Sequence, residues 1–93
     1  MKTIFDISNR NISKDEMKVF IGSFIEYSHK ITELQLANNR IGPEGIMYLM
    51  KTKWTNLKSL NLENNNIKAE GARHLAHPSN GWNNLEYLNL SKK

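Results

Sequence analysis

Side chains that could act in catalysis are scattered along this chain of 93 residues and recur in no pattern. A nucleophilic site needs a nucleophile, a base and a group that orients the base, and no such set has a defensible spacing here. His74 and His77 lie three residues apart, but a zinc site needs a third ligand that no motif supplies. The glycines form no phosphate-binding loop, and cysteine is absent. We therefore expect no enzyme, no metal site and no cofactor.

A second group of polar side chains alternates with leucines in short stretches of the chain. Such side chains donate and accept hydrogen bonds, and Tyr87 adds an aromatic ring, a type enriched where proteins bind each other. Alternation of polar and apolar residues predicts short strands with one buried face and one exposed face. The exposed positions that we select as partner-binding candidates are Asp6, Glu33, Gln35, Ser59, Asn61, Glu63, Tyr87 and Asn89.

These stretches are copies of one repeat. Residues 31–36, 57–62 and 85–90 share the pattern, and their starts are 26 and 28 residues apart. A fixed period of this size is the sequence signature of a solenoid. We expect a single domain, 1–93, with a degenerate N-terminal cap repeat at 1–30, full repeats at 31–56 and 57–84, and a partial repeat at 85–93.

Five positions recur in both full repeats, four of them apolar and one an asparagine. The apolar residues are Ile31, Leu34, Leu36 and Ile41 in one repeat and Leu57, Leu60, Leu62 and Ile67 in the other. Asn39 and Asn65 stand where the chain must turn inward after its strand, and an asparagine side chain can satisfy buried backbone groups there. We interpret Asn38, Asn64 and Asn66 as ordinary loop residues.

The second half of each repeat is predicted to be helical. Pro43 suits the first turn of a helix, and Pro78 ends the next helix by about His77. Gly45 and Gly71 hold the same repeat position, which indicates close packing around the helices, because glycine otherwise weakens a helix. The residues predicted to face the core in this half are Ile46, Leu49, Ala72, Leu75 and Ala76, with Trp54 and Trp82 just ahead of the next strands.

The first 30 residues match the repeat only loosely. Lys2 and Arg10 stand where a leucine and the asparagine are expected, and terminal repeats are often atypical because they cap the stack. Ser13 and Glu16 have the spacing of a capping box. The helix that follows places Met17, Phe20, Ile21 and Phe24 on one face.

The repeat pattern resembles that of leucine-rich-repeat proteins of the ribonuclease-inhibitor-like subtype. Its motif, LxxLxLxxNxIxxxGxxxL, runs through residues 31–49 and again through 57–75. The resemblance implies an α/β solenoid of about three and a half repeats. It further implies a right-handed arc, with parallel strands on the concave face and α-helices on the convex face. Family members are mostly intracellular and mostly bind proteins through the concave face.

Parallel strands place equivalent residues in rows across a sheet. One predicted row contains Ile4, Glu33, Ser59 and Tyr87, and the next contains Asp6, Gln35, Asn61 and Asn89. This surface is polar and slightly acidic, which argues against the phosphate backbone of a nucleic acid as its ligand. The leading hypothesis is a non-catalytic scaffold that binds a protein partner on the concave face.

An alternative function concerns the end of the sheet. The last predicted strand, 87–90, has no helix after it, and an open strand edge invites pairing. The alternative hypothesis is a structural, self-assembling element that associates through this edge, with a homodimer as a possible form. The other option for this end is that the sequence is a fragment of a longer solenoid. The net charge of +4 comes from scattered lysines, which predicts a solvated surface rather than a nucleic-acid site. No apolar run reaches membrane-spanning length, so we expect no membrane span. The absence of cysteine fits a reducing compartment, and the resemblance implies an intracellular, cytoplasmic protein, with delivery into a host cell as an open option.

Overall fold

The four predicted strands lie side by side in one parallel sheet, in chain order β1-β2-β3-β4. The computed structural model describes residues 2–24, 26–76 and 82–92. The strands are β1 (Ile4–Asp6), β2 (Glu33–Gln35), β3 (Ser59–Asn61) and β4 (Tyr87–Asn89). The helices are α1 (Lys14–Phe24), α2 (Gly42–Leu49) and α3 (Lys68–Leu75), with a short 3-10 helix at Ser28–Lys30.

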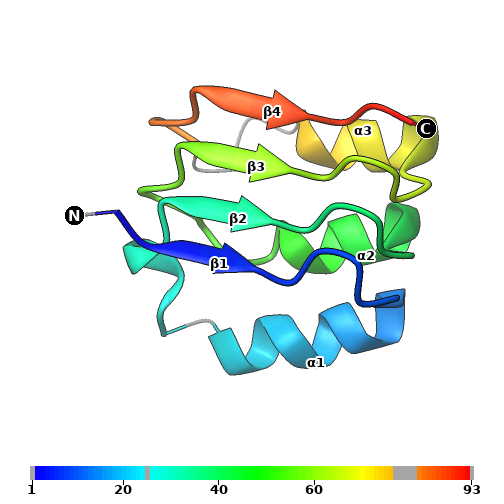
Figure 1. Cartoon of the computed structure of the whole chain (residues 1–93), viewed down its shortest axis with the longest axis horizontal. Coiled ribbons are helices and arrows are strands. Elements are labelled where there is room, and N and C mark those ends of the chain that lie inside the picture. Colours follow the sequence, from blue (N-terminus) through cyan, green and yellow to red (C-terminus); the bar gives the residue numbers. More distant parts are fainter. Residues whose placement is uncertain (1, 25, 77–81, 93) are drawn as a thin grey trace.

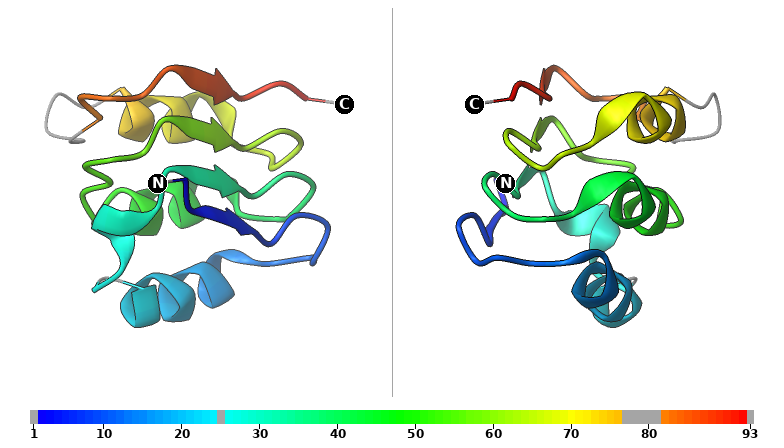
Figure 2. Two further views of the ribbon diagram at one scale, coloured as in Figure 1. Left: turned by 60° about the vertical axis from the view of Figure 1, so that its left-hand side comes forward. Right: turned by 90° about the vertical axis from the view of Figure 1, so that its right-hand side faces the viewer.

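All three α-helices cover the same face of the sheet, as Figure 1 shows. The helices are spread over a greater length than the strands in every view of Figures 1 and 2. A helix is about 10 Å wide, whereas neighbouring strands lie about 4.8 Å apart. The sheet is therefore the concave side, and the predicted α/β solenoid with parallel strands is confirmed.

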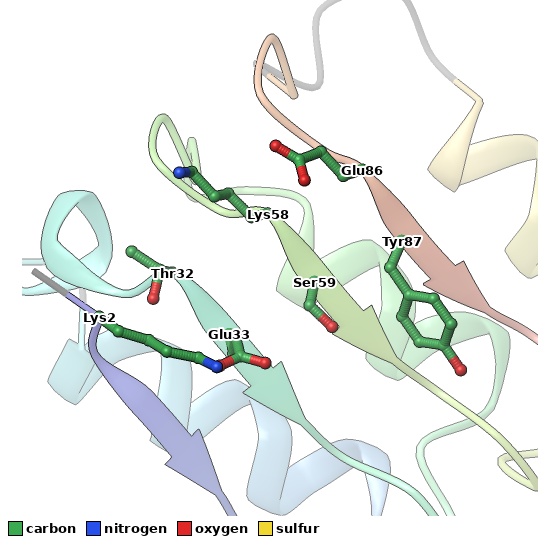
Figure 3. Close-up of a pocket in the computed structure, with 7 residues that line it drawn as sticks. All are labelled: Lys2, Thr32, Glu33, Lys58, Ser59, Glu86 and Tyr87. Atoms are coloured by element: carbon green, nitrogen blue, oxygen red, sulfur yellow. The ribbon is translucent and has the colours of Figure 1, made fainter.

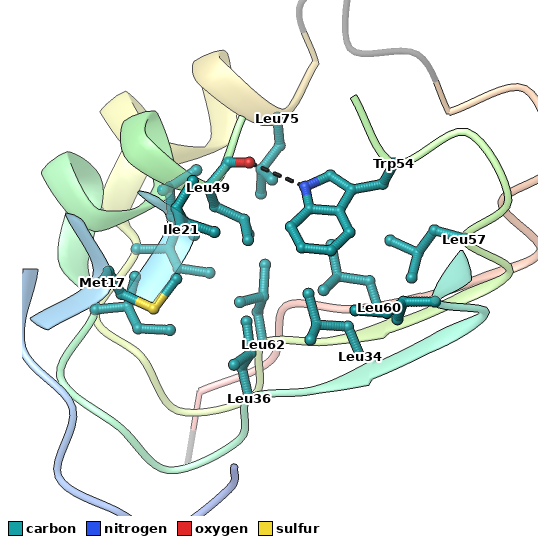
Figure 4. Close-up of a cluster of buried hydrophobic side chains, with 14 residues drawn as sticks. Met17, Ile21, Leu34, Leu36, Leu49, Trp54, Leu57, Leu60, Leu62 and Leu75 are labelled. Carbon is teal, nitrogen blue, oxygen red and sulfur yellow. Dashed lines mark hydrogen bonds between the residues drawn. The ribbon is translucent and has the colours of Figure 1, made fainter. Parts of the chain in front are cut away.

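The core fills the space between the sheet and the helices (Figure 4). The leucines of β2 and β3 and those that follow them are fully buried, namely Leu34, Leu36, Leu60 and Leu62. Trp54 is also buried, and its indole N–H donates a hydrogen bond of 2.9 Å to the Leu49 carbonyl. The prediction that Trp54 belongs to the core is confirmed, and Trp82 packs against the same core while partly buried.

Two of the residues predicted to face the core are exposed. Ala72 and Ala76 both lie on the surface of the α3 region, whereas Leu75 is buried. The prediction was wrong for the two alanines, because α3 packs on α2 and no further described helix covers its other side. Helix α3 ends at Leu75, while His77 and Pro78 lie outside the described residues, as does the side chain of Phe24.

The inward turns after the strands are held by Asn39 and Asn65, as predicted. The Asn65 side-chain amide donates to the carbonyl groups of Leu36 and Leu62 at 2.8 and 3.1 Å. The Asn39 side-chain oxygen accepts the N–H of Ile12 at 3.0 Å. Each of these bonds satisfies a backbone group at a buried or partly buried bend.

The other asparagines of these turns are more than ordinary loop residues. Asn38, Asn64 and Asn66 have φ angles of 58, 57 and 54°, in the left-handed region that asparagine tolerates better than most side chains. The Asn64 amide also donates to the Asn38 side-chain oxygen at 3.1 Å, which links two repeats. The asparagine-rich composition of the turns thus has a conformational cause.

Close packing explains the glycine shared by α2 and α3. A Cβ atom on Gly45 would lie 2.4 Å from the Ile41 Cγ2 atom and 3.5 Å from the Cα of Lys14 on α1. A Cβ atom on Gly71 would likewise lie 2.4 Å from the Ile67 Cγ2 atom of its own repeat and 3.4 Å from the Pro43 Cα atom on α2. The first helix instead begins with the predicted capping box, in which the Glu16 N–H donates to the Ser13 hydroxyl.

Candidate functional site

The predicted rows of side chains are present on the concave face of the sheet. Ile4 lies beside Glu33, Glu33 beside Ser59, and Ser59 beside Tyr87. The register also aligns the second row, Asp6, Gln35, Asn61 and Asn89. The repeat determines the register of the sheet, because a shift of one residue between neighbouring strands would move every leucine of the shifted strand out of the core.

A hollow of about 540 Å³ lies on this face, at the end where the strands begin. Its lining residues are Lys2, Thr32, Glu33, Lys58, Ser59, Glu86 and Tyr87. Glu33, Ser59 and Tyr87 belong to β2, β3 and β4. The other four residues lie in the segments that lead into the strands (Figure 3). The hollow brings together three of the eight predicted binding residues, Glu33, Ser59 and Tyr87.

Charges of both signs surround the hollow. The Lys2 ammonium lies 2.9 Å from a carboxylate oxygen of Glu33, whose side chain is 20% exposed. Lys58 and Glu86 add one charge of each sign at the rim (Figure 3). The prediction of a slightly acidic surface does not hold for this part of the face, because two lysines balance two glutamates. Such a site suits a partner that offers polar groups of both signs.

Three other candidates, each the last residue of its strand, have a side-chain oxygen that already accepts a hydrogen bond from the segment just after that strand. Asp6, Asn61 and Asn89 each accept the N–H of the residue two positions later, at 3.0 Å in every case. This is the local turn that Asp and Asn side chains form readily. The hydrogen bond from the Ser8 N–H is the largest cause of a lowered pKa at Asp6, and the Ser8 hydroxyl adds to it. These residues shape the ends of the strands, and their role in binding stays a prediction.

Gln35 and Glu63 complete the predicted set. Both side chains are partly exposed, next to the central strands. A carboxylate oxygen of Glu63 accepts a hydrogen bond of 3.4 Å from the Asn89 amide. Neither residue lines the hollow, so the structure divides the predicted set into a group at the hollow and a group near the other end of the strands.

The sequence-based selection missed four residues of the hollow, Lys2, Thr32, Lys58 and Glu86. Thr32, Lys58 and Glu86 stand one position before the first predicted row and share its register. The selection began at the strands themselves and left this preceding row out. Lys2 stands where the repeat has a leucine, and this departure was a usable signal, because its side chain stays 67% exposed and its ammonium group pairs with Glu33.

Two features of the described residues concern metal binding and the membrane. Over residues 2–24, 26–76 and 82–92, no three acidic or histidine side chains are grouped as metal ligands would be. The helices of the same residues are too short and too polar to cross a bilayer. The arrangement is instead a shallow polar surface with one exposed tyrosine, which suits recognition.

Comparison with known proteins identifies the repeat. The family described as Leucine Rich repeat matches residues 27–50 and 55–76. A comparison with curated proteins gave no significant match. Leucine-rich repeats generally mediate protein–protein interaction, and proteins built from them are typically non-catalytic scaffolds. The two matched repeats, together with the parallel sheet and its one-sided layer of helices, show that this chain is a leucine-rich-repeat protein.

Proposed function

We propose that this protein is a non-catalytic interaction module that binds a protein partner at the concave hollow. The observation that carries the proposal is the hollow itself, where Lys58, Ser59 and Tyr87 lie together on neighbouring strands. Tyr87 is 51% exposed in spite of its size, and an exposed aromatic ring beside charged groups can serve as an interface anchor.

The partner that fits is an extended peptide segment or a protein edge with mixed polar chemistry. Lys58 offers a cation, Glu86 an anion and Ser59 a hydroxyl within one hollow of about 540 Å³. A segment that carries one acid and one base near each other would match both charges, and complementary charges favour orientation and association rate. The ribonuclease-inhibitor-like subtype, with its use of the concave face, supports the same assignment by resemblance.

A photo-crosslinking amino acid would test which face is used. We would place it at Ser59 inside the hollow and, in a separate protein, at Thr55, which is exposed in the loop before β3. A protein that is crosslinked in cell lysate from position 59 but not from position 55 would support the proposal. Crosslinking from position 55 alone would refute it.

A matched pair of variants would then test affinity for the captured protein. Ser59→Arg fills the hollow with a long side chain, and we expect it to weaken binding by tenfold or more, about 1.4 kcal/mol. Thr55→Arg introduces the same side chain at an exposed position that does not line the hollow, and we expect it to leave the affinity unchanged. Circular dichroism of both variants verifies the fold before binding is measured.

A further inference from the structure

The Glu33 carboxylate is the charged group of the concave hollow that is most withdrawn from solvent. Its side chain is 20% exposed, whereas Lys58 and Glu86 lie exposed at the rim. One of its oxygens, Oε2, is buried. Withdrawal of a carboxylate from water costs free energy unless a cation or hydrogen-bond donors replace the water. The identity of the group that faces Glu33 is therefore important for binding in this hollow.

The cation that faces this carboxylate within the chain is Lys2, and the match between the two groups is imperfect. The Lys2 ammonium lies 2.9 Å from the Oε2 atom of Glu33. This oxygen nevertheless accepts no hydrogen bond within the described residues, so the two charges touch without the alignment of a hydrogen bond. The Lys2 side chain is 67% exposed, and an exposed ion pair adds little stability. A better-placed cation can therefore displace Lys2 at small cost.

The register of the sheet leaves room beside the carboxylate. Ser59 lies next to Glu33, and Tyr87 lies next to Ser59. Neighbouring strands are about 4.8 Å apart, so β2 and β4 lie roughly 10 Å from each other, with the small serine between them. Figure 3 shows the three side chains in one row, with Ser59 between the carboxylate and the tyrosine ring. The space over Ser59 has the width of one side chain of a partner.

The charges of the hollow indicate which kind of side chain fits this space. With Lys2 in place, the hollow contains two lysines and two glutamates and has no net charge. Without Lys2, two carboxylates face the Lys58 ammonium alone, and the net charge is −1. An anion that entered beside Glu33 would add to this imbalance, whereas a cation would remove it.

We propose that the hollow receives an arginine side chain of the protein partner, which displaces Lys2 from Glu33. This inference rests on the proposed function, since it names the part of the partner that the hollow binds. A guanidinium group offers donors in a planar fork, bonds a carboxylate through two hydrogen bonds and is less strongly hydrated than an ammonium group. The arginine stem would lie over Ser59, beside the ring of Tyr87. Lys2 is then an internal competitor for the same carboxylate.

A short peptide tests this site directly. The probe is acetyl-Gly-Arg-Gly-amide, and its control contains citrulline, which has nearly the shape of arginine but no charge. The backbone amide signals of Ser59 and Tyr87 would be followed by NMR in the full chain at low salt, where screening is weak. We expect the arginine peptide to bind with a Kd of roughly 1–10 mM and the citrulline peptide at least about fivefold more weakly. Equal affinities, or no binding of the arginine peptide up to roughly 20 mM, would overturn the proposal.

A pair of lysine variants tests the displacement of Lys2. Lys2→Ala removes the competitor and should tighten binding of the arginine peptide about two- to fivefold, which is the range that an exposed ion pair allows. Lys53→Ala makes the same change of net charge at an exposed position that does not line the hollow. We expect this control to change the affinity by less than about twofold. Equal effects of the two variants would show that Lys2 does not compete for the site.

A pair of glutamate variants tests the carboxylate itself. Glu33→Gln keeps the shape of the side chain and removes its charge, so it should weaken binding of the arginine peptide at least about fivefold. Glu63→Gln makes the same change on the same face of the sheet, outside the hollow, and should have little effect. Circular dichroism verifies the fold of each variant. Unchanged binding by a folded Glu33→Gln protein would overturn the arginine site.

The inference and the proposed function fail in different experiments. Crosslinking from position 59 tests whether a protein binds at the hollow. A protein that is captured there and binds Glu33→Gln as tightly as the unaltered chain would overturn the inference and leave the proposed function standing. Crosslinking from position 55 alone would refute the proposed function and, with it, the inference.

Discussion

The side-chain amide of Asn65 donates a hydrogen bond of 2.8 Å to the carbonyl of Leu36, in the repeat before its own. The Asn65 side-chain oxygen accepts the N–H of Ile41 from that same repeat at 3.3 Å. One buried side chain therefore satisfies both a donor and an acceptor of the neighbouring turn. Asn39 does the same for the first repeat, where its oxygen accepts the N–H groups of Arg10 and Ile12. These asparagines join the repeats as well as shaping each turn.

Replacement of Asn65 by alanine tests this joint directly. Asn65→Ala removes the partner of the Ile41 N–H and of the Leu62 carbonyl, whereas the Leu36 carbonyl keeps its hydrogen bond from the Asn39 amide. An unsatisfied buried group costs about 1–3 kcal/mol. We expect the free energy of unfolding to fall by about 3 kcal/mol in urea titrations followed by circular dichroism. Asn83→Ala, at an exposed position, should change it by less than about 0.5 kcal/mol. Equal effects of the two variants would contradict the structural role of Asn65.

Substitution by alanine is expected to change stability in opposite directions at two of the helix glycines, Gly71 and Gly22. An added Cβ atom at Gly71 would lie 2.4 Å from the Ile67 Cγ2 atom and 3.4 Å from the Pro43 Cα atom, whereas nothing lies within 4 Å at Gly22. Gly71→Ala should destabilise the protein by about 1–3 kcal/mol through overpacking. Gly22→Ala should stabilise it by about 0.5–1 kcal/mol, because alanine is the better helix former. Thermal unfolding of both variants would show whether the signs differ.

Gly42 and Lys68 occupy the same place at the start of α2 and α3. Their φ angles are 67 and 62°, so both adopt the left-handed conformation. This conformation costs an ordinary side chain roughly 1–2 kcal/mol and costs glycine little. Lys68→Gly should therefore raise the free energy of unfolding by about 0.5–1 kcal/mol, after allowance for the greater freedom of glycine in the unfolded chain. Gly42→Lys should lower it, and urea titrations of the pair would measure both changes.

The period of the sequence predicted most of the fold, including the register of the sheet. The rows through Glu33 and Gln35 followed from the repeat because a strand with one buried face admits only one alignment. The exposure of Ala72 was not predictable from the period, since the pattern of one repeat does not say whether another helix covers it. The same limit applies to the hollow, whose rim residues Lys58 and Glu86 precede the strands and belong to no repeat position with a fixed type.

The repeat pattern also did not predict the backbone conformation of the turn asparagines. Asn38 and Asn64 directly precede Asn39 and Asn65 in the sequence. Residue type alone does not tell which asparagine is buried and bonds the neighbouring repeat and which adopts the left-handed backbone conformation. The φ angles of 58 and 57° separate the two roles. The candidate site was predicted in part for a similar reason, because alternation indicates which face a residue shares but not which of its atoms are already engaged, as they are in Asp6.

The lowered pKa of Asp6 leads to a prediction about acid stability. Its cause is chiefly the hydrogen bond from the Ser8 N–H, which favours the charged carboxylate over the protonated form. Because the pKa is lower in the folded state, the carboxylate contributes its stability above its ordinary pKa of 3.8 and loses it as the pH falls through the lowered value. Asn61 holds the same strand position and forms the same turn with an amide that does not titrate.

Asp6→Asn should therefore keep the turn and remove this part of the acid dependence. We expect urea midpoints of the variant to decline less than those of the unaltered protein when the pH is lowered below 3.8. Asp6→Ala lacks the acceptor and should be the less stable of the two variants at every pH. An Asp6→Asn protein whose stability follows the same acid profile as the unaltered chain would show that the Ser8 hydrogen bond does not favour the carboxylate, since the linkage between protonation and folding leaves no other result.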